Sequence, residues 1–157
     1  MDELVRLINR QHSSEYAAIV YSKENLCRHV EAGIAKLHWK DFETLVDLLF
    51  RATGWRRVSV LGETMKFSDM ELEEPMTGDM YQVQVKSAAT VHDLREYTEA
   101  FAGGKYRKLF FVVHSPDPRL EKIPQSDDGA VQVILPRRLA EMVVDLGLLS
   151  WLLNKTR

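Results

Sequence analysis

An alternating strand–turn–strand pattern between residues 67 and 87 limits what this chain can fold into more than any other feature. Successive side chains of a strand point to opposite faces. The polar row of the first arm consists of Asp69, Glu71 and Glu73, and that of the second arm consists of Gln82, Gln84 and Lys86. A turn at Thr77–Gly78 lays these rows side by side and gathers the apolar rows on the opposite face, where a core can cover them. The sequence therefore predicts an antiparallel hairpin with one polar face and one buried face.

The polar face of this hairpin combines carboxylates, amide oxygens and one ammonium group. Such a set suits a hard divalent cation, which takes oxygen ligands in proteins. The same alternation is also typical of any antiparallel hairpin that keeps one face in water. The segments around the hairpin separate these two interpretations.

The segment 37–50, which precedes the hairpin, has the pattern of an amphipathic helix. Its apolar face consists of Phe42, Leu45, Val46 and Leu49. Gly54 is well placed to end this helix in the left-handed conformation. Glu43 lies at the edge of the apolar stripe, so we expect that its carboxylate can reach inward over the sheet.

The remaining pattern predicts strands at 56–61, 109–113 and 130–134 and helices from Thr90 or Asp93 to Gly104, after Pro136, and at 148–153. The run 109–113 is continuously apolar, which is typical of a central strand buried on both faces. The order of elements predicts an α/β/α sandwich around a five-stranded mixed sheet. The pattern of residues 1–37 predicts helices, one of which begins with Ser13 or Ser14 as its N-cap. We expect them to form an N-terminal helical extension, packed on the main domain (38–157) or on a second copy of it.

Size, charge and cysteine content exclude several classes of protein. A chain of 157 residues with 45% hydrophobic residues has room for one domain with a real core. Its formal net charge is −2, so a nucleic-acid partner must be held by a local basic patch. The single Cys27 allows no internal disulfide, and the sequence shows no leader and no apolar run of membrane-spanning length. We therefore expect a soluble cytoplasmic protein with no membrane partner.

The order of these segments resembles the PD-(D/E)xK nuclease superfamily, and within it the Mrr-like restriction endonuclease branch. The strings that carry the resemblance are Asp41–Val46 with Gly54–Trp55, Asp69–Leu72 and Val83–Ser87. The similarity extends over residues 38–153. It implies a restriction-endonuclease-like fold and an endonuclease that hydrolyses DNA phosphodiester bonds with Mg²⁺ or Mn²⁺, in restriction or host defence.

Carried over to this chain, the resemblance assigns Gln84 and Lys86 to the Gln-x-Lys positions and Glu43 to the helix glutamate. The acid before the hairpin is either Asp69, which has the usual residue type, or Glu71, which fits the shorter hairpin spacing of the branch. These carboxylates would hold the metal, completed by the Gln84 side-chain oxygen or by the backbone carbonyl of Val85. Lys86 would orient or deprotonate the attacking water and counter the developing negative charge.

Three cations, Lys105, Arg107 and Lys108, follow a glycine pair and form a candidate clamp for DNA phosphates. Arg56–Arg57 and Arg137–Arg138 are similar candidates. Cutting both DNA strands usually requires two active sites, so we expect a homodimer, acting alone or within a larger defence system.

Two competing hypotheses remain from the sequence. The first is a non-catalytic module of nuclease fold that binds DNA or a partner protein, which Gln84 and the mildly acidic net charge favour. The second is a purely structural or oligomerising role for the N-terminal helices.

Overall fold

In the computed structural model of this protein, residues 13–58, 70–101, 104–123 and 129–157 are described. They form a five-stranded sheet with the strand order β1-β2-β3-β4-β5. The strands are β1 (Arg56–Arg57), β2 (Met70–Glu73), β3 (Met80–Ala89), β4 (Lys108–Pro116) and β5 (Val131–Ile134). The first three strands pair antiparallel, whereas β3, β4 and β5 pair parallel. The expected mixed sheet is therefore confirmed.

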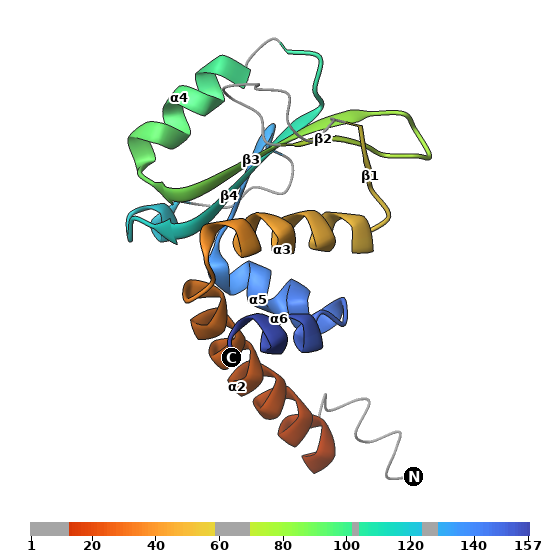
Figure 1. Ribbon diagram of the computed structural model, residues 1–157, viewed down its shortest axis with the longest axis vertical. Coiled ribbons are helices and arrows are strands. Elements are labelled where there is room, and N and C mark those ends of the chain that lie inside the picture. The colour runs from red at the N-terminus through yellow and green to blue at the C-terminus, as the bar shows by residue number, and fades with distance from the viewer. Residues whose placement is uncertain (1–12, 59–69, 102–103, 124–128) are drawn as a thin grey trace.

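Helices cover both faces of this sheet (Figure 1). They are α2 (Ser14–Ala35), α3 (Trp39–Ala52), α4 (Val91–Phe101), α5 (Pro136–Asp145) and α6 (Leu149–Lys155), with a short 3₁₀ turn at Leu120–Lys122. Helix α4 lies over one face, and α3 and α5 lie on the other (Figure 1). The α/β/α layering expected from the sequence is confirmed.

Strand β3 separates two hydrophobic cores, because its side chains alternate between them. Val83 and Val85 belong to the larger core, together with the buried faces of α3 and α5. Phe111 and Val113 of β4 belong to the smaller core, which α4 covers through Leu94. Partners in a parallel pair share a face, and Gln84 pairs with Phe111. Gln84 and Lys86 therefore point to the α4 side of the sheet.

The β2–β3 hairpin has the register that the two polar rows predict. Glu71 pairs with Gln82 on the polar side, and Met70 pairs with Val83 on the buried side. Gly78 in the connecting turn has φ +73°, a conformation that an L side chain rarely adopts. The Glu74 carboxylate accepts hydrogen bonds from the Thr77 hydroxyl and from the backbone N–H groups of Met76 and Thr77, and these bonds lower its pKa.

Local signals in the sequence also fixed the limits of two helices. Gly54 follows α3 with φ +87°, as expected for a glycine that ends a helix. At the start of α4, Thr90 and Asp93 form a reciprocal capping box, in which the Asp93 carboxylate accepts from the Thr90 N–H at 2.7 Å. The Asp93 N–H donates to the Thr90 hydroxyl oxygen at 3.3 Å. These bonds to Thr90 lower the pKa of Asp93.

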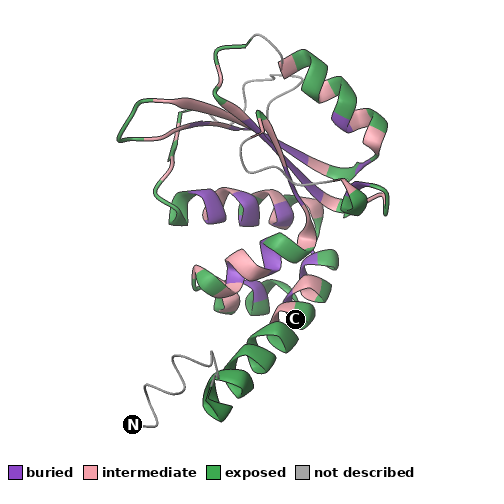
Figure 2. Ribbon diagram, turned by 180° about the vertical axis from the view of Figure 1, so that it is seen from behind, coloured by how far each residue is buried: buried purple, intermediate pink, exposed green. Residues whose placement is uncertain are grey.

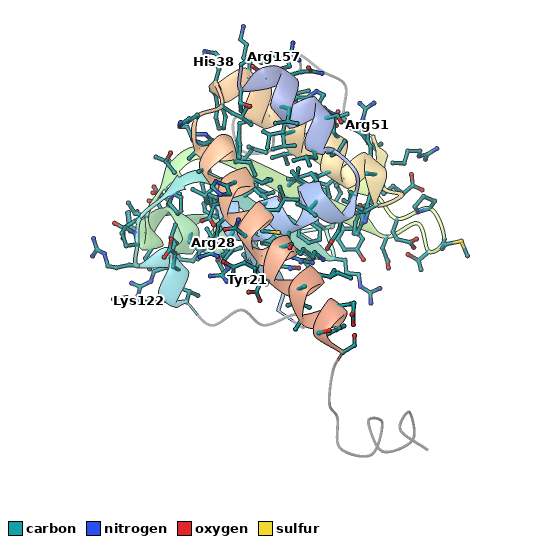
Figure 3. All side chains as sticks on the ribbon, turned by 90° about the horizontal axis from the view of Figure 1, so that it is seen from below. Tyr21, Arg28, His38, Arg51, Lys122 and Arg157 are labelled. Carbon is teal, nitrogen blue, oxygen red and sulfur yellow. The ribbon has the colours of Figure 1, made fainter. Side chains whose placement is uncertain are left out.

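Helix α2 combines a buried half with an exposed half. Val30 and Ile34 join the larger core, and Lys23 pairs with Asp145 of α5 at 2.6 Å. Every described residue from Ser13 to Leu26 is exposed, and this part of the helix extends beyond the body of the protein (Figure 2). Tyr21, labelled in Figure 3, is 66% exposed. The last part of the expected extension, which contains Val30 and Ile34, thus contributes to the main core.

Two expectations fall partly outside the described residues. Arg56–Arg57 form β1, but residues 59–61 of the expected first strand are not described. Residues 67–69 of the first hairpin arm are not described either. Among the helices that are described, none has the length and apolar character needed to span a bilayer.

Candidate active site

Gln84 and Lys86 are adjacent polar positions of β3 on the side covered by α4. Gln84 is only 3% exposed and is a buried polar residue in a sheet that is otherwise apolar at this level. Its cross-strand partner on β4 is Phe111. The Lys86 ammonium lies 4.5 Å from the centroid of the Tyr97 ring on α4. An amide and an ammonium group are therefore held side by side by a strand that is buried on both faces.

Glu43 approaches the same end of the sheet from the opposite layer. It lies in the first half of α3 next to Phe42, whose ring is 4.7 Å from that of His114. His114 follows Val113, the β4 residue that pairs with Lys86. The start of α3 therefore lies beside the ends of β3 and β4 that carry Lys86. Glu43 is partly buried there.

Glu71 lies further toward the hairpin turn. It pairs with Gln82, four residues before Lys86 on β3, which at about 3.3 Å per residue is a separation of roughly 13 Å along the strand. Its carboxylate accepts a hydrogen bond from the Tyr106 hydroxyl. The Lys105 ammonium is 3.4 Å from the same oxygen. The Glu71 carboxylate thus takes part in an interaction with the segment that precedes β4.

Asp69 lies outside the described residues. The described pairing of β2 with β3 ends at Met70 and Val83, and Asp69 and Gln84 are the next residues of the two arms in the sequence. Among the residues that the structure describes, no group of three or more His, Cys, Asp or Glu side chains could hold a metal ion. A metal site on the described part of the chain would therefore need Gln84, a backbone carbonyl or both to supplement its carboxylates.

The cations of the expected phosphate clamp are engaged with the hairpin. Lys105 contacts Glu71, and Arg107 pairs with the Asp79 carboxylate at 2.5 Å. The backbone N–H of Arg107 also donates to the Met80 carbonyl at 2.8 Å. The Lys105 and Arg107 side chains remain 67% and 66% exposed. Surface pairs of this kind are weak, so a phosphate can compete for both cations.

A comparison with models of protein families identifies the family to which this chain belongs. Residues 34–116, more than half of the chain, match the catalytic-domain model of the Mrr-type restriction endonucleases. The chain belongs to the Mrr-type restriction endonuclease family. Comparisons with curated proteins and with solved structures found no match.

The matched segment of this Mrr-type chain extends from the end of α2 to the end of β4. It includes every residue assigned to the site from the sequence, namely Glu43, Asp69, Glu71, Gln84, Val85, Lys86, Lys105, Arg107 and Lys108. The family implies a restriction-type endonuclease, a hydrolase whose substrate is DNA. Its members generally use divalent metal ions.

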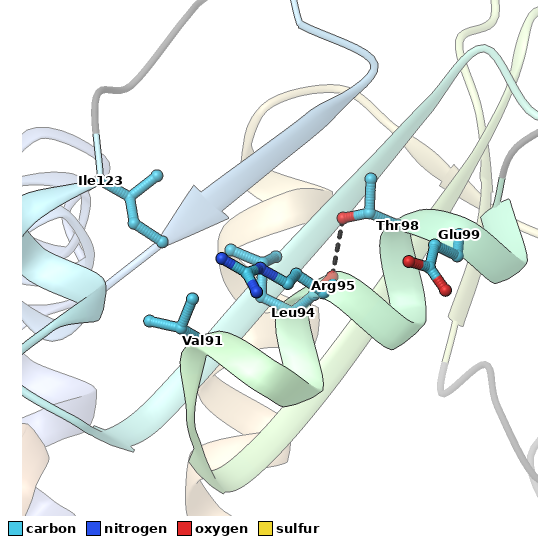
Figure 4. Close-up of a pocket in the computed structure, with 6 residues that line it drawn as sticks. All are labelled: Val91, Leu94, Arg95, Thr98, Glu99 and Ile123. Atoms are coloured by element: carbon cyan, nitrogen blue, oxygen red, sulfur yellow. Dashed lines mark hydrogen bonds between the residues drawn. The ribbon is translucent and has the colours of Figure 1, made fainter.

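A separate pocket of the Mrr-type chain lies along α4 and is not part of this site (Figure 4). Its volume is about 360 Å³, and its lining is mainly apolar. The lining residues are Val91, Leu94, Arg95, Thr98, Glu99 and Ile123. Thr98 donates its hydroxyl to the Leu94 carbonyl at 2.7 Å, which leaves a helix-internal bond rather than a free polar group at the pocket wall.

Sequence reasoning missed two aromatic residues of the site region, Tyr97 and Tyr106. The hydroxyl of Tyr106 meets Glu71 although the two are 35 positions apart, and no local spacing signals such a contact. Tyr97 follows Leu94 at helical spacing, a position typical of a core residue, and nothing in the sequence signals its contact with Lys86. This contact could have been inferred from the connection between the parallel strands β3 and β4. Such a connection runs through α4 and places that helix over the strand that carries Lys86.

The Tyr106–Glu71 contact predicts a tyrosine that titrates at unusually high pH. Burial raises the pKa of Tyr106 to about 12, helped by the hydrogen bond to the Glu71 carboxylate and by its charge. Because the folded pKa is raised, the contact stabilises the fold below the ordinary tyrosine pKa of about 10 and is lost as the pH rises through 12. Ultraviolet titration at the tyrosinate band measures this.

Two variants test whether the titration step near pH 12 belongs to Tyr106. In Tyr106→Phe the step near pH 12 is expected to disappear. In Glu71→Gln it is expected to move toward lower pH without reaching the ordinary value, because burial remains. A step that stays in place in Tyr106→Phe would contradict the assignment.

Proposed function

We propose that this chain is a divalent-metal-dependent DNA endonuclease that acts in restriction or host defence. The observation that carries the proposal is that a buried amide, Gln84, and the ammonium of Lys86 lie two residues apart on the same face of β3. Glu43 is supplied to the same end of the sheet by α3. Phosphodiester hydrolysis needs a positioned water and positive charge near the phosphate, and these residues are of the types that provide them.

The residues present fit a hard cation such as Mg²⁺ or Mn²⁺ by their chemistry. Asp69, Glu43, the Gln84 side-chain oxygen and the Val85 carbonyl are oxygen donors, which such a cation prefers. Of the two acids considered before the hairpin, we favour Asp69 over Glu71. Glu71 is displaced along the strand by roughly 13 Å from Lys86 and already contacts Tyr106 and Lys105. When bound, the metal supplies Lewis acidity and a water of lowered pKa.

Lys86 acts on the substrate from the α4 side of the sheet. As an ammonium, its side chain orients the attacking water and counters the negative charge that develops on the phosphate oxygens; as a neutral amine, it accepts the proton of that water. The buried position of Gln84 keeps the strand backbone fixed next to it. Glu43 would add a carboxylate from α3, whose first turns lie near the ends of β3 and β4 on the opposite side of the sheet.

The role of Lys86 predicts that Lys86→Ala loses cleavage while the protein stays folded. Removal of a group that stabilises the transition state costs about 10²–10³ in rate. The measurement is nicking and linearisation of plasmid with Mg²⁺, Mn²⁺ or EDTA, together with thermal unfolding of the same samples. Lys122→Ala is the matched control, because Lys122 is an exposed lysine on the 3₁₀ turn. Cleavage by Lys86→Ala at the rate of this control would refute the assignment.

The choice between the two acids predicts different responses to metal. A ligand that binds only the folded state raises the melting temperature. Mg²⁺ and Mn²⁺ are expected to stabilise the wild-type protein and Glu71→Gln, but not Asp69→Asn, since of these two acids only Asp69 is assigned to the metal. Loss of the metal-induced shift in Glu71→Gln, with retention in Asp69→Asn, would reverse the assignment.

We also propose that Lys105, Arg107 and Lys108 bind the DNA backbone. Each phosphate contact makes the negative slope of log affinity against log salt steeper by about 0.9. The double variant Lys105→Ala/Arg107→Ala, measured on a duplex without metal, is expected to bind more weakly and to have a slope that is shallower by about 2. Lys122→Ala again serves as the control. A salt slope identical in both variants would exclude the clamp.

Cleavage of both strands calls for two active sites, so we propose that the chain acts as a homodimer, alone or in a larger defence system. Light scattering at the assay concentration measures the oligomer directly. The second candidate function, a non-catalytic DNA-binding or protein-binding module, is favoured by one observation, the amide at position 84 in place of a carboxylate. DNA binding without cleavage under every metal condition would support that function instead.

A further inference from the structure

The Lys86 ammonium does not extend freely from β3 but rests on an aromatic ring. Its Nζ atom lies 4.5 Å from the centroid of Tyr97. A cation within about 6 Å of a ring centroid is attracted by the negative face of the π-system. The contact joins the strand that carries the site to the helix that covers it, and it involves the one lysine that the proposed chemistry uses.

The Tyr97 ring is itself held in place by packing against the sheet. Its ring packs on Phe111 with the centroids 5.5 Å apart. Phe111 is fully buried and is the β4 residue that pairs with Gln84. The same buried ring therefore supports Tyr97 and adjoins Gln84. A movement of Tyr97 relative to Gln84 would have to disturb the smaller core.

The helix that carries Tyr97 is fixed at its start as well. Thr90 and Asp93 close the capping box that begins α4, and Leu94 anchors its first turns in the smaller core. Asp93 precedes Tyr97 by one helical turn, and the positive charge of Lys86 adds only the smallest contribution to the lowering of the Asp93 pKa, after the bonds to Thr90. The contact that joins the Lys86 ammonium to α4 is therefore the one with the Tyr97 ring.

A lysine side chain has four flexible methylene groups and a compact, strongly hydrated charge. Without a partner it samples many rotamers, and only some of them bring the ammonium to a given point. Catalytic groups must be held close to the productive geometry to be effective. A ring face that attracts the charge and lies on a fixed helix restricts these rotamers without a competing hydrogen bond.

We propose that Tyr97 is a positioning residue for Lys86. The face of its ring holds the ammonium at the point from which it acts on the attacking water. The inference rests on the proposed nuclease function, because only there does Lys86 meet substrate. It adds that the aromatic ring of residue 97, and not its hydroxyl, sets the efficiency of Lys86.

Two substitutions separate the ring from the hydroxyl. Tyr97→Phe keeps an aromatic face over Lys86 and removes the hydroxyl. Tyr97→Leu keeps an apolar contact with Phe111 but removes the ring. Thermal unfolding of both variants establishes the temperature range in which each is folded, and all other measurements are made within that range.

The first readout is independent of cleavage. Protons above an aromatic ring are shifted upfield in the NMR spectrum, so the ε-methylene protons of Lys86 are expected to be upfield-shifted in metal-free wild-type protein. The spectrum of Lys86→Ala identifies their signal by its loss. The shift is expected to persist in Tyr97→Phe and to vanish in Tyr97→Leu.

The second readout is the split between kcat and KM for cleavage of a labelled duplex with Mg²⁺. Tyr97→Leu is expected to lower kcat on the order of 10-fold, the size of a partly desolvated cation–π contact, with KM nearly unchanged. Tyr97→Phe is expected to keep kcat close to that of the wild type. Equal losses in both variants would assign the effect to the hydroxyl and overturn the inference.

These outcomes are distinct from a failure of the proposed function. If Lys86→Ala cleaves DNA like the wild type, the nuclease assignment of Lys86 fails whatever Tyr97 does. If Lys86→Ala is inactive while Tyr97→Leu keeps both the upfield shift and the wild-type kcat, only the positioning role is refuted.

Discussion

The burial of β3 on both faces is the constraint on which the rest of the structure depends. A strand between two cores presents alternate side chains to each of them, so Val83 and Val85 fill one core while Gln84 and Lys86 face α4. A one-residue slip in its register would exchange these sets and bury the ammonium among α3 side chains. Pairing with β4 over eight positions from Tyr81 to Ala89 makes such a slip costly. Packing in the two cores therefore fixes the direction in which Gln84 and Lys86 point.

Charge pairing around the hairpin is the second organising feature. Glu73 pairs with Arg56, Asp79 with Arg107, and Glu71 with Tyr106 and Lys105. The acidic row that the sequence displays is thus largely used to attach β1 and the segment before β4 to the hairpin. This is why a row of carboxylates on one strand face does not amount to a metal site along its whole length. We therefore assign the proposed chemistry to the region next to Gln84 and Lys86.

The arrangement of layers places residues of the proposed site in both helical layers and in the sheet. Helix α3 brings Glu43 from one layer, and α4 brings Tyr97 from the other, to the same end of β3 and β4. Neither helix contributes through its buried stripe alone. In each helix the residue in question follows or adjoins that stripe, so the packing that stabilises the helix also positions the side chain that we assign to the proposed site.

By itself, the amino-acid sequence determined the elements and their order. Alternation in the hairpin, the helical stripe around Phe42, a helix start at Thr90 or Asp93 and the glycines at 54 and 78 are local signals, and the structure agrees with them. That Thr90 and Asp93 cap this helix together was seen only in the structure. The mixed five-stranded sheet and its two helical layers followed from that order. The partner of Glu71, the support of Lys86 and the division of α2 into a buried and an exposed half did not follow. These depend on which distant surfaces meet once the sheet is assembled, because side-chain contacts between residues many positions apart are set by register and crossover geometry rather than by spacing along the chain.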